Sequence, residues 1–399
     1  MPQALNDSNL FRPLKVGHVL LKNRLVHAPA TRFRNSDKFV PTDSMLRYYS
    51  ERAENNGGLI ITEASFPTPE FGLFPNTPVI QTSKQVQGWK QIVKSIHDNG
   101  SYVAVQLWNL GRAAPAGLLK QYGINYRGVS NNYADEKTEN EAIEAGNPLK
   151  ALTKTELKWM VAEYVSVAER AINIAGFDLI ELHAGHSFLI GEFLRESTNE
   201  RLDEYGGNLE NRVRLVLEIV DALIASVGAD HIGIKLTPYI EDQDAQGKAS
   251  SVKTHTYLLE QLQRRAENGN KLAYIALTQP RMAGDTEKED FNGEDTTWVI
   301  KAWKGIIIRT GAFFHDENYL DLKTDVNEND RTLIGAGRYY TSNPDLADRL
   351  KNGYPLTPYD RSTFYTAMSN KGYITWPKFG EKEVSNLTEI SNSSPKPLV

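Results

Sequence analysis

The chain has 399 residues, enough for two average domains or for one large barrel. Its 45 basic and 50 acidic residues give a net charge of −5, so its composition offers no basic surface for nucleic acid or an anionic membrane. It contains no cysteine, which excludes disulfides, thiolate nucleophiles, iron–sulfur clusters and cysteine-ligated zinc sites.

The sequence shows no segment suited to export or to membrane insertion. Asn6 and Asp7 interrupt the first residues, where a secretory signal would need an apolar stretch. The run nearest to the ~20 apolar residues of a membrane span is 215–227, and Glu218 and Asp221 make it amphipathic. We therefore expect a cytoplasmic protein with no membrane or nucleic-acid partner.

Short apolar runs alternate with amphipathic helical patterns along the chain. The runs cover residues 24–28, 58–62, 102–107, 178–183, 232–236, 273–277, 305–309 and 332–335. The helical patterns between them include 83–99, 153–175, 209–227, 254–268 and 344–352. Near-continuous apolar runs are typical of strands buried on both faces of a parallel sheet. This alternation predicts an α/β fold, a closed (β/α)₈ TIM barrel. An open doubly wound sheet is the alternative, but the glycine-rich first turn expected of it is missing.

Two segments depart from this alternation. Residues 109–152 are polar with little helical periodicity, and we expect a long excursion there after the third strand, over the mouth of the active site. Residues 1–380 are predicted to form a single barrel domain. Residues 381–399 are rich in Ser, Asn and Pro, and we expect them to be a flexible tail.

The residues that follow each predicted strand are the candidates for chemistry, because active sites of such barrels lie at the carboxyl ends of the strands. They are mostly polar or basic, and Glu63 is the one acidic residue among them. A glycosidase needs two facing carboxylates, so that chemistry is not favoured.

His183 and His186 lie three residues apart after the fourth predicted strand, so both rings can face one pocket. They could ligate a metal, satisfy the backbone, or donate two N–H groups to a substrate carbonyl. A metal needs a third ligand, and no neighbouring strand end offers one, so we expect no metal and favour the donor pair. With an ordinary pKa near ~6.5, these histidines would make ligand affinity vary between roughly pH 5 and 8.

A phosphate site is indicated at the end of the last two strands. Residues 335–338 read GAGR, in which Gly337 allows close approach of backbone amides and Arg338 adds a charged fork. Arg309 and Gly311 follow the seventh strand, and the loops after strands seven and eight of such barrels often hold phosphate. The alternative is a tight turn followed by a surface arginine.

Lys235 and Gln106 point to the ring of an anionic cofactor. Lys235 ends the fifth strand, where it could form a Schiff base or serve as the counter-charge of such a ring. Gln106, in the third strand, has an amide suited to a uracil-like edge. Together they favour a flavin.

A series of blocks makes the chain resemble the Old Yellow Enzyme family of fungal FMN-dependent ene-reductases. The blocks are APATR (28–32), ITE (61–63), VQLW (105–108), NERLDEYGGNLENR (199–212), IGAGR (334–338), SNPDLADRL (342–350), YDRSTFY (359–365) and GYITWP (372–377). The resemblance implies an enzyme that reduces activated C=C bonds of α,β-unsaturated carbonyls and nitroalkenes with NADPH, by a ping-pong mechanism. It also implies phenolic ligands and is compatible with a homodimer.

The same resemblance implies roles for individual residues. The flavin ring would be lined by Pro29, Thr31, Ala64 and Gln106. Its phosphate would be held by Gly311, Gly337 and Arg338. The substrate oxygen would be gripped by His183 and His186. The substrate pocket would be shaped by Phe74, Trp108, Pro280 and Tyr365.

Two positions depart from the family pattern. Lys235 stands where many members carry arginine, so the charge is kept and the bidentate fork is lost. Phe188 stands where the family has the tyrosine that acts as general acid, and phenylalanine cannot deliver a proton. This leaves two alternatives to an ene-reductase: a flavin-dependent alkene isomerase, and a ligand-binding flavoprotein with slow turnover.

Overall fold

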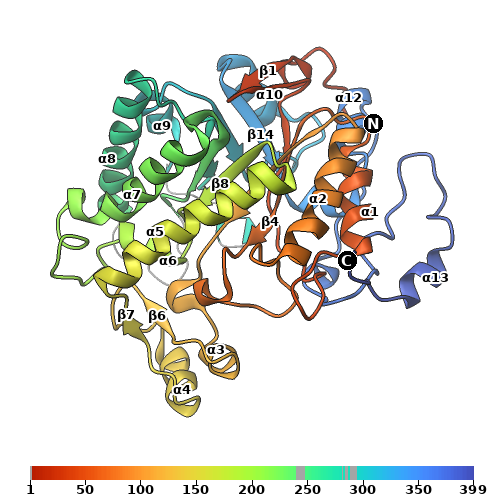
Figure 1. Ribbon diagram of the computed structural model, residues 1–399. Coiled ribbons are helices and arrows are strands. Elements are labelled where there is room, and N and C mark those ends of the chain that lie inside the picture. The colour runs from red at the N-terminus through yellow and green to blue at the C-terminus, as the bar shows by residue number, and fades with distance from the viewer. Residues whose placement is uncertain (1, 240–247, 281, 284–285, 288–293) are drawn as a thin grey trace.

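A closed barrel of parallel strands forms the centre of the molecule (Figure 1). The computed structural model describes residues 2–239, 248–280, 282–283, 286–287 and 294–399. The barrel strands are β3 (Leu25–His27), β4 (Leu59–Ser65), β5 (Tyr102–Leu107), β8 (Leu179–His183), β9 (Ile232–Leu236), β10 (Tyr274–Thr278), β13 (Ile307–Thr310) and β14 (Thr332–Ala336). Each coincides with a predicted apolar run. The predicted (β/α)₈ barrel is therefore confirmed, and the open-sheet alternative is wrong.

The pairing register decides which side chains meet inside the barrel. Strand β14 pairs with β3, which closes the cylinder. Gln106 of β5 lies opposite Glu181 of β8, and His183 of β8 lies opposite Lys235 of β9. Since successive side chains of a strand point to opposite faces, Glu181 and His183 share one face of β8.

Helices cover the outside of the barrel. They include α1 (Asp43–Ala53), α2 (Ser83–Asp98), α5 (Lys154–Glu169), α7 (Leu209–Val227), α8 (Lys248–Glu267), α9 (Thr297–Ala302), α10 (Leu320–Glu328) and α12 (Leu346–Asn352). Capping boxes at Thr82 and Thr153 start α2 and α5. The helix predicted over 153–175 is α-helical to Glu169 and continues as a π-helical segment, Arg170–Ala175.

A hairpin closes the amino-terminal end of the barrel. Its strands β1 (Leu14–Val16) and β2 (Val19–Leu21) pair antiparallel. Val16, Val19 and Leu21 are buried in the same apolar cluster as the barrel residues Ile61 and Ile308. With this end filled, the carboxyl ends of the strands are the side on which a site can open.

The excursion over residues 109–152 contains α3 (Ala116–Gln121), α4 (Glu136–Glu144) and a short parallel pair, β6 (Arg127–Gly128) and β7 (Lys150–Ala151). Its helices project from the body of the molecule (Figure 1). We expected it to cover the mouth of the active site, and that is wrong: none of the described residues that line the main cavity comes from it. It lines a separate cavity of about 240 Å³ beside α5.

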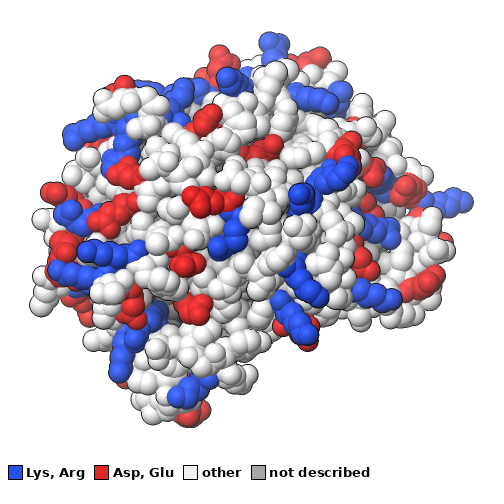
Figure 2. All heavy atoms as spheres, viewed as in Figure 1, with Lys and Arg blue, Asp and Glu red and all other residues white. Residues whose placement is uncertain are grey.

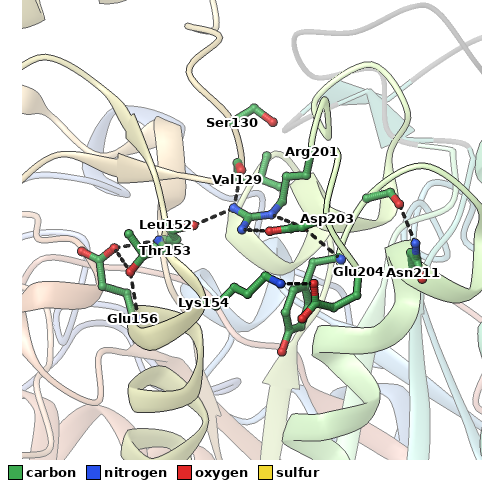
Figure 3. A network of polar contacts seen from close by, with 12 residues as sticks. Val129, Ser130, Leu152, Thr153, Lys154, Glu156, Arg201, Asp203, Glu204 and Asn211 are labelled. Atoms are coloured by element: carbon green, nitrogen blue, oxygen red, sulfur yellow. Dashed lines mark hydrogen bonds and ion pairs between the residues drawn. The ribbon is translucent and has the colours of Figure 1, made fainter.

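Arg201, in the NERLDEYGG run, clamps the excursion to the barrel (Figure 3). Its Nη1 donates to the carbonyl oxygens of Val129 and Leu152 at 3.1 and 2.7 Å, beside β6 and β7. Its Nε and Nη2 donate to the Asp203 carboxylate at 3.0 and 2.6 Å. Next to this clamp, the more exposed Lys154 pairs with Glu204. The run is therefore a structural element and takes no part in the cavity.

We expect Arg201→Met to lower the free energy of unfolding by about 3 kcal/mol, because it leaves buried acceptors without their donor. Urea denaturation followed by circular dichroism measures this loss. Lys154→Met is the control: it removes a neighbouring ion pair whose side chains are about half exposed, which contributes about 0–1 kcal/mol. Equal losses in both variants would contradict a clamp centred on Arg201.

The carboxyl-terminal segment 381–399 contains the short helix α13 (Leu387–Asn392) and lies near the start of α1 (Figure 1). The backbone N–H of Asp43 donates to the carbonyl of Lys396, and that of Leu398 donates to Pro41. These contacts give the segment a defined place on the barrel. Its flexibility in solution stays a prediction.

The surface carries both signs of charge. On the face shown in Figure 2, basic and acidic side chains are interspersed. In the described part of the chain, no helix combines the length and apolarity that crossing a bilayer requires.

Candidate active site

A cavity of about 630 Å³ opens at the carboxyl ends of the barrel strands. Thirteen of the predicted site residues line it. They are Pro29, Thr31, Ala64, Gln106, Trp108, His183, His186, Phe188, Lys235, Gly311, Gly337, Arg338 and Tyr365. The exceptions are Phe74, Pro280 and Arg309, which are not among the described lining residues. Phe74 packs beside Trp108, with ring centroids 6.1 Å apart.

The loop after β8 brings the two histidines together. A Cβ at Gly185 would come within 2.7 Å of Thr237 Oγ1, so glycine lets the loop approach β9 closely. There the backbone N–H of His186 donates to the Thr237 hydroxyl. His186 adopts a left-handed backbone with φ 54°, a strained state for a residue with a side chain. The ring centroids of His183 and His186 lie 5.1 Å apart.

Both histidines are neutral donors. Burial, reinforced by the electrostatic interactions with His186 and Lys235, holds the pKa of His183 well below its usual value. Burial likewise lowers the pKa of His186 to about 3. Both shifts favour the neutral rings and therefore argue against the predicted dependence of ligand affinity on pH between 5 and 8.

The tautomer of His183 follows from its neighbour. The backbone N–H of Gly185 donates to His183 Nδ1 at 3.3 Å, so the proton of the neutral ring is on Nε2. His186 Nδ1 is buried, and no partner for it is found among the described residues. Each ring therefore has a nitrogen that can hydrogen-bond to a ligand in the cavity.

Phe188 stands among these rings. Its centroid lies 5.0 Å from that of His183 and 5.0 Å from that of Trp108, both edge to face. The position where a general acid is expected is thus occupied by the phenyl ring of Phe188, which has no proton to donate. His186 does not replace it, because a histidine with a pKa of about 3 carries no acidic imidazolium proton at neutral pH.

On the barrel side of the cavity, Gln106 and Lys235 flank a carboxylate that sequence reasoning missed. Gln106 Nε2 donates to Glu181 Oε1 at 2.6 Å, and Glu181 is fully buried. Burial raises the pKa of Glu181, and the charge of Lys235 opposes that rise. The pairing disfavours a Schiff-base lysine, because a neighbouring carboxylate favours the ammonium form.

The other end of the cavity suits a phosphate group. A Cβ at Gly337 would meet nothing within 4 Å, so its backbone is open to the cavity. Arg338 Nη1 donates to the Tyr359 hydroxyl at 2.9 Å, which holds the guanidinium in place. Arg309, expected to contribute, instead forms an ion pair with Asp325 of α10 at 2.7 Å. It lies on the outer face of β13, one residue from the cavity-lining Thr310.

Arg32 also lines the cavity, and the sequence did not reveal its role. It is buried, and its guanidinium donates to the carbonyl oxygens of Phe364 and Gly372 at 3.0 and 3.1 Å. Arg32 thereby connects the end of β3 to residues 364–372, which include Tyr365.

In the described part of the chain, the group best placed to hold a metal is remote from this cavity. His18, Asp230 and His231 present ligand atoms within 4.8 Å of one another. They lie at the β1–β2 turn and just before β9, at the amino-terminal end of the barrel.

The cavity fits FMN on its own geometry. An amide and an ammonium stand at one end, an open glycine and a guanidinium stand at the other, and neutral imidazoles lie on the wall. The buried Nε1 of Trp108 and Nδ1 of His186 have no hydrogen-bond partner within the described ranges, so a ligand has polar atoms left to meet.

Comparisons with known proteins agree with this fit. The model of the NADH:flavin oxidoreductase / NADH oxidase family matches residues 9–357. A Candida albicans protein described as a probable NADPH dehydrogenase is 43% identical over 95% of this chain and 93% of its own. Enoate reductase 1 of Kluyveromyces lactis is 38% identical over 95% and 96%. The crystal structure of Old Yellow Enzyme from Pichia sp. AKU4542 superposes with a TM-score of 0.94 and is 47% identical, covering 99% of this chain and 100% of that one.

Proposed function

The chain belongs to the NADH:flavin oxidoreductase / NADH oxidase family, that of Old Yellow Enzyme, and from this premise we propose that it is an NADPH-dependent ene-reductase working through FMN. Its proposed substrates are α,β-unsaturated carbonyls and nitroalkenes. The observation that carries this proposal is the pair of neutral histidines that line one cavity together with Gln106 and Lys235.

FMN, when bound, supplies the hydride chemistry, and the protein supplies orientation and charge. We assign the ring edge to Gln106 and Lys235, the ring surroundings to Pro29, Thr31 and Ala64, and the phosphate to Gly311, Gly337 and Arg338. His183 Nε2–H and His186 donate to the substrate oxygen and stabilise the negative charge that develops on it. A single donor of this kind typically contributes about 3 kcal/mol in the transition state.

We propose a ping-pong order, because the described lining forms one cavity that the nicotinamide and the acceptor would occupy in turn. Phenols should bind there too, since a phenolate oxygen can accept from both imidazoles. The relatives named as a dehydrogenase and an enoate reductase favour reduction over the isomerase and slow-turnover alternatives.

Product analysis tests the proposal. The purified protein is incubated with NADPH and cyclohexenone under anaerobic conditions, and the products are separated by gas chromatography. We expect cyclohexanone in equal amount to the NADPH consumed. A rearranged alkene, or NADPH that stays unused, would exclude the ene-reductase.

The neutral histidines also predict a flat pH profile. The apparent dissociation constant of cyclohexenone, which has no titratable group, should change less than about threefold between pH 5 and 8, because burial lowers the pKa of His186 to about 3 and holds that of His183 well below its usual value. Saturation of the stopped-flow oxidation of the reduced enzyme measures it. A transition centred near the ordinary histidine pKa of about 6.5 would show that the rings are solvated, contrary to the geometry.

A further inference from the structure

Glu181 occupies a position in the barrel that no step of the proposed reaction uses. It lies on β8 directly opposite Gln106 on β5, and accepts from the Gln106 amide nitrogen at 2.6 Å. Glu181 is fully buried, and Gln106 is 3% exposed. An N–H···O distance this short is typical of an ionised acceptor.

Lys235 accounts for an ionised carboxylate at this depth. It lies on β9, which pairs with β8 on the side away from β5. Glu181 pairs with Gly233 of β9, and Lys235 is two residues further along that strand. The charge of Glu181 raises the pKa of Lys235 against the effect of burial, and Lys235 has the converse effect on Glu181. Burying either charge alone would be costly, so the two stabilise each other.

Tyr274 is the third residue beside Glu181. A Cβ at Gly233 would come within 2.2 Å of Tyr274 Cζ, so the missing side chain makes room for this ring. The Tyr274 ring is buried near Glu181. Burial raises the pKa of its phenol, and the charge of Glu181 raises it further. The carboxylate is thus enclosed by Gln106, Lys235 and Tyr274.

This arrangement decides which end of the Gln106 amide meets a ligand. A primary amide has a donor end and an acceptor end, and rotation exchanges them. With the nitrogen committed to Glu181, the carbonyl oxygen is the end of the amide left for the cavity that Gln106 lines. A flavin ring presents an N–H between two carbonyl groups at its pyrimidine edge, and such an N–H needs an acceptor.

We propose that Glu181 is a positioning residue of the cofactor site: it locks the Gln106 amide with its oxygen toward the cavity, so that the site selects a ring with a free N3–H. The inference rests on the proposed function, because it concerns the same flavin site. Lys235 contributes by keeping the Glu181 carboxylate ionised in the interior.

Cofactor exchange on the holoenzyme tests this role. Excess 3-methyl-FMN, in which the N3–H is blocked, is equilibrated with the FMN-loaded protein, and the bound flavins are extracted and quantified. Wild type should prefer FMN by about tenfold or more, the value of one unmet hydrogen bond in a buried site. Glu181→Gln should keep this preference within about threefold, because a second amide can still accept from the Gln106 nitrogen.

Glu181→Met should lose most of the preference, because the Gln106 amide is then free to rotate. Glu181→Met/Lys235→Met should lose it as well, and this variant leaves no buried ammonium without a partner. Glu192→Gln is the matched control: Glu192 is another fully buried carboxylate, bonded to the backbone N–H groups of Arg112 and Val129 outside the cavity. Its preference should equal that of wild type.

A Glu181→Met protein that discriminates against 3-methyl-FMN as strongly as wild type overturns the proposal. So does a Glu192→Gln protein that loses discrimination equally, because the effect would then be one of general stability. Wild-type protein that retains no FMN would contradict the proposed function instead, so the two failures are distinguishable.

Discussion

Replacing Phe188 with tyrosine is expected to raise the rate of enone reduction by about 10²- to 10⁴-fold, the usual contribution of a positioned general acid. Net reduction of an enone needs a proton at the carbon alpha to the carbonyl. Phe188 fills the position from which the family's tyrosine would give it, 5.0 Å centroid to centroid from His183. A restored phenol would supply that proton inside the cavity.

The effect of Phe188→Tyr should be confined to one half-reaction and to one class of substrate. Reduction of the enzyme by NADPH transfers no proton to the substrate, so its rate should change little. Nitroalkenes should gain less than enones, because a nitronate is a stable anion that can leave and take up its proton in water. Stopped-flow oxidation of the reduced enzyme by cyclohexenone and by a nitroalkene gives both rates.

The opposite result is equally clear. Wild type that already oxidises rapidly with cyclohexenone, and gains less than about threefold from Phe188→Tyr, would show that another group supplies the proton. The candidates would then be water and the two tyrosines of the described lining, Tyr339 and the exposed Tyr365, because the pKa of His186, about 3, is too low.

Removing one of the paired donors is expected to slow the same oxidative step by about 10²- to 10³-fold, the usual cost of a lost donor at a developing oxyanion. His186→Ala should show this loss, because its ring faces the cavity with an unpartnered buried nitrogen. His186→Asn is the matched variant, since an amide keeps an N–H donor, and it should stay within about tenfold of wild type. Equal rates for His186→Ala and wild type would leave His183 as the sole donor and contradict the pair.

The fold was predictable because its determinants are local. Every barrel strand was marked by its own apolar run, as at Ile232–Leu236, and the capped helices α2 and α5 by Thr and Gln or Glu at the right spacing. The excursion was misplaced for the converse reason: its position is set by the Arg201 clamp to Val129 and Leu152, contacts between segments far apart in the sequence.

The site was predictable where residues follow a strand or occupy one of its last two positions, and it was missed deeper within a strand. Glu181 stands inside an apolar run, and only the register with Gln106 and the side-chain alternation on β8 reveal that it points inward. The same alternation sends Arg309 outward to Asp325. The sequence suggested ordinary histidine pKa values, whereas burial lowers them. Burial of a ring is a property of the folded cavity, and the spacing of two histidines does not contain it.

The central claim, that the two ends of this cavity hold FMN for reaction with NADPH and an alkene, has one direct test. The purified protein should be yellow, with one FMN per chain released on denaturation. Anaerobic NADPH should bleach the visible band, and cyclohexenone or a nitroalkene added afterwards should restore it. A colourless protein, a released cofactor other than FMN, or a reduced flavin that oxygen reoxidises but neither alkene does would contradict the account.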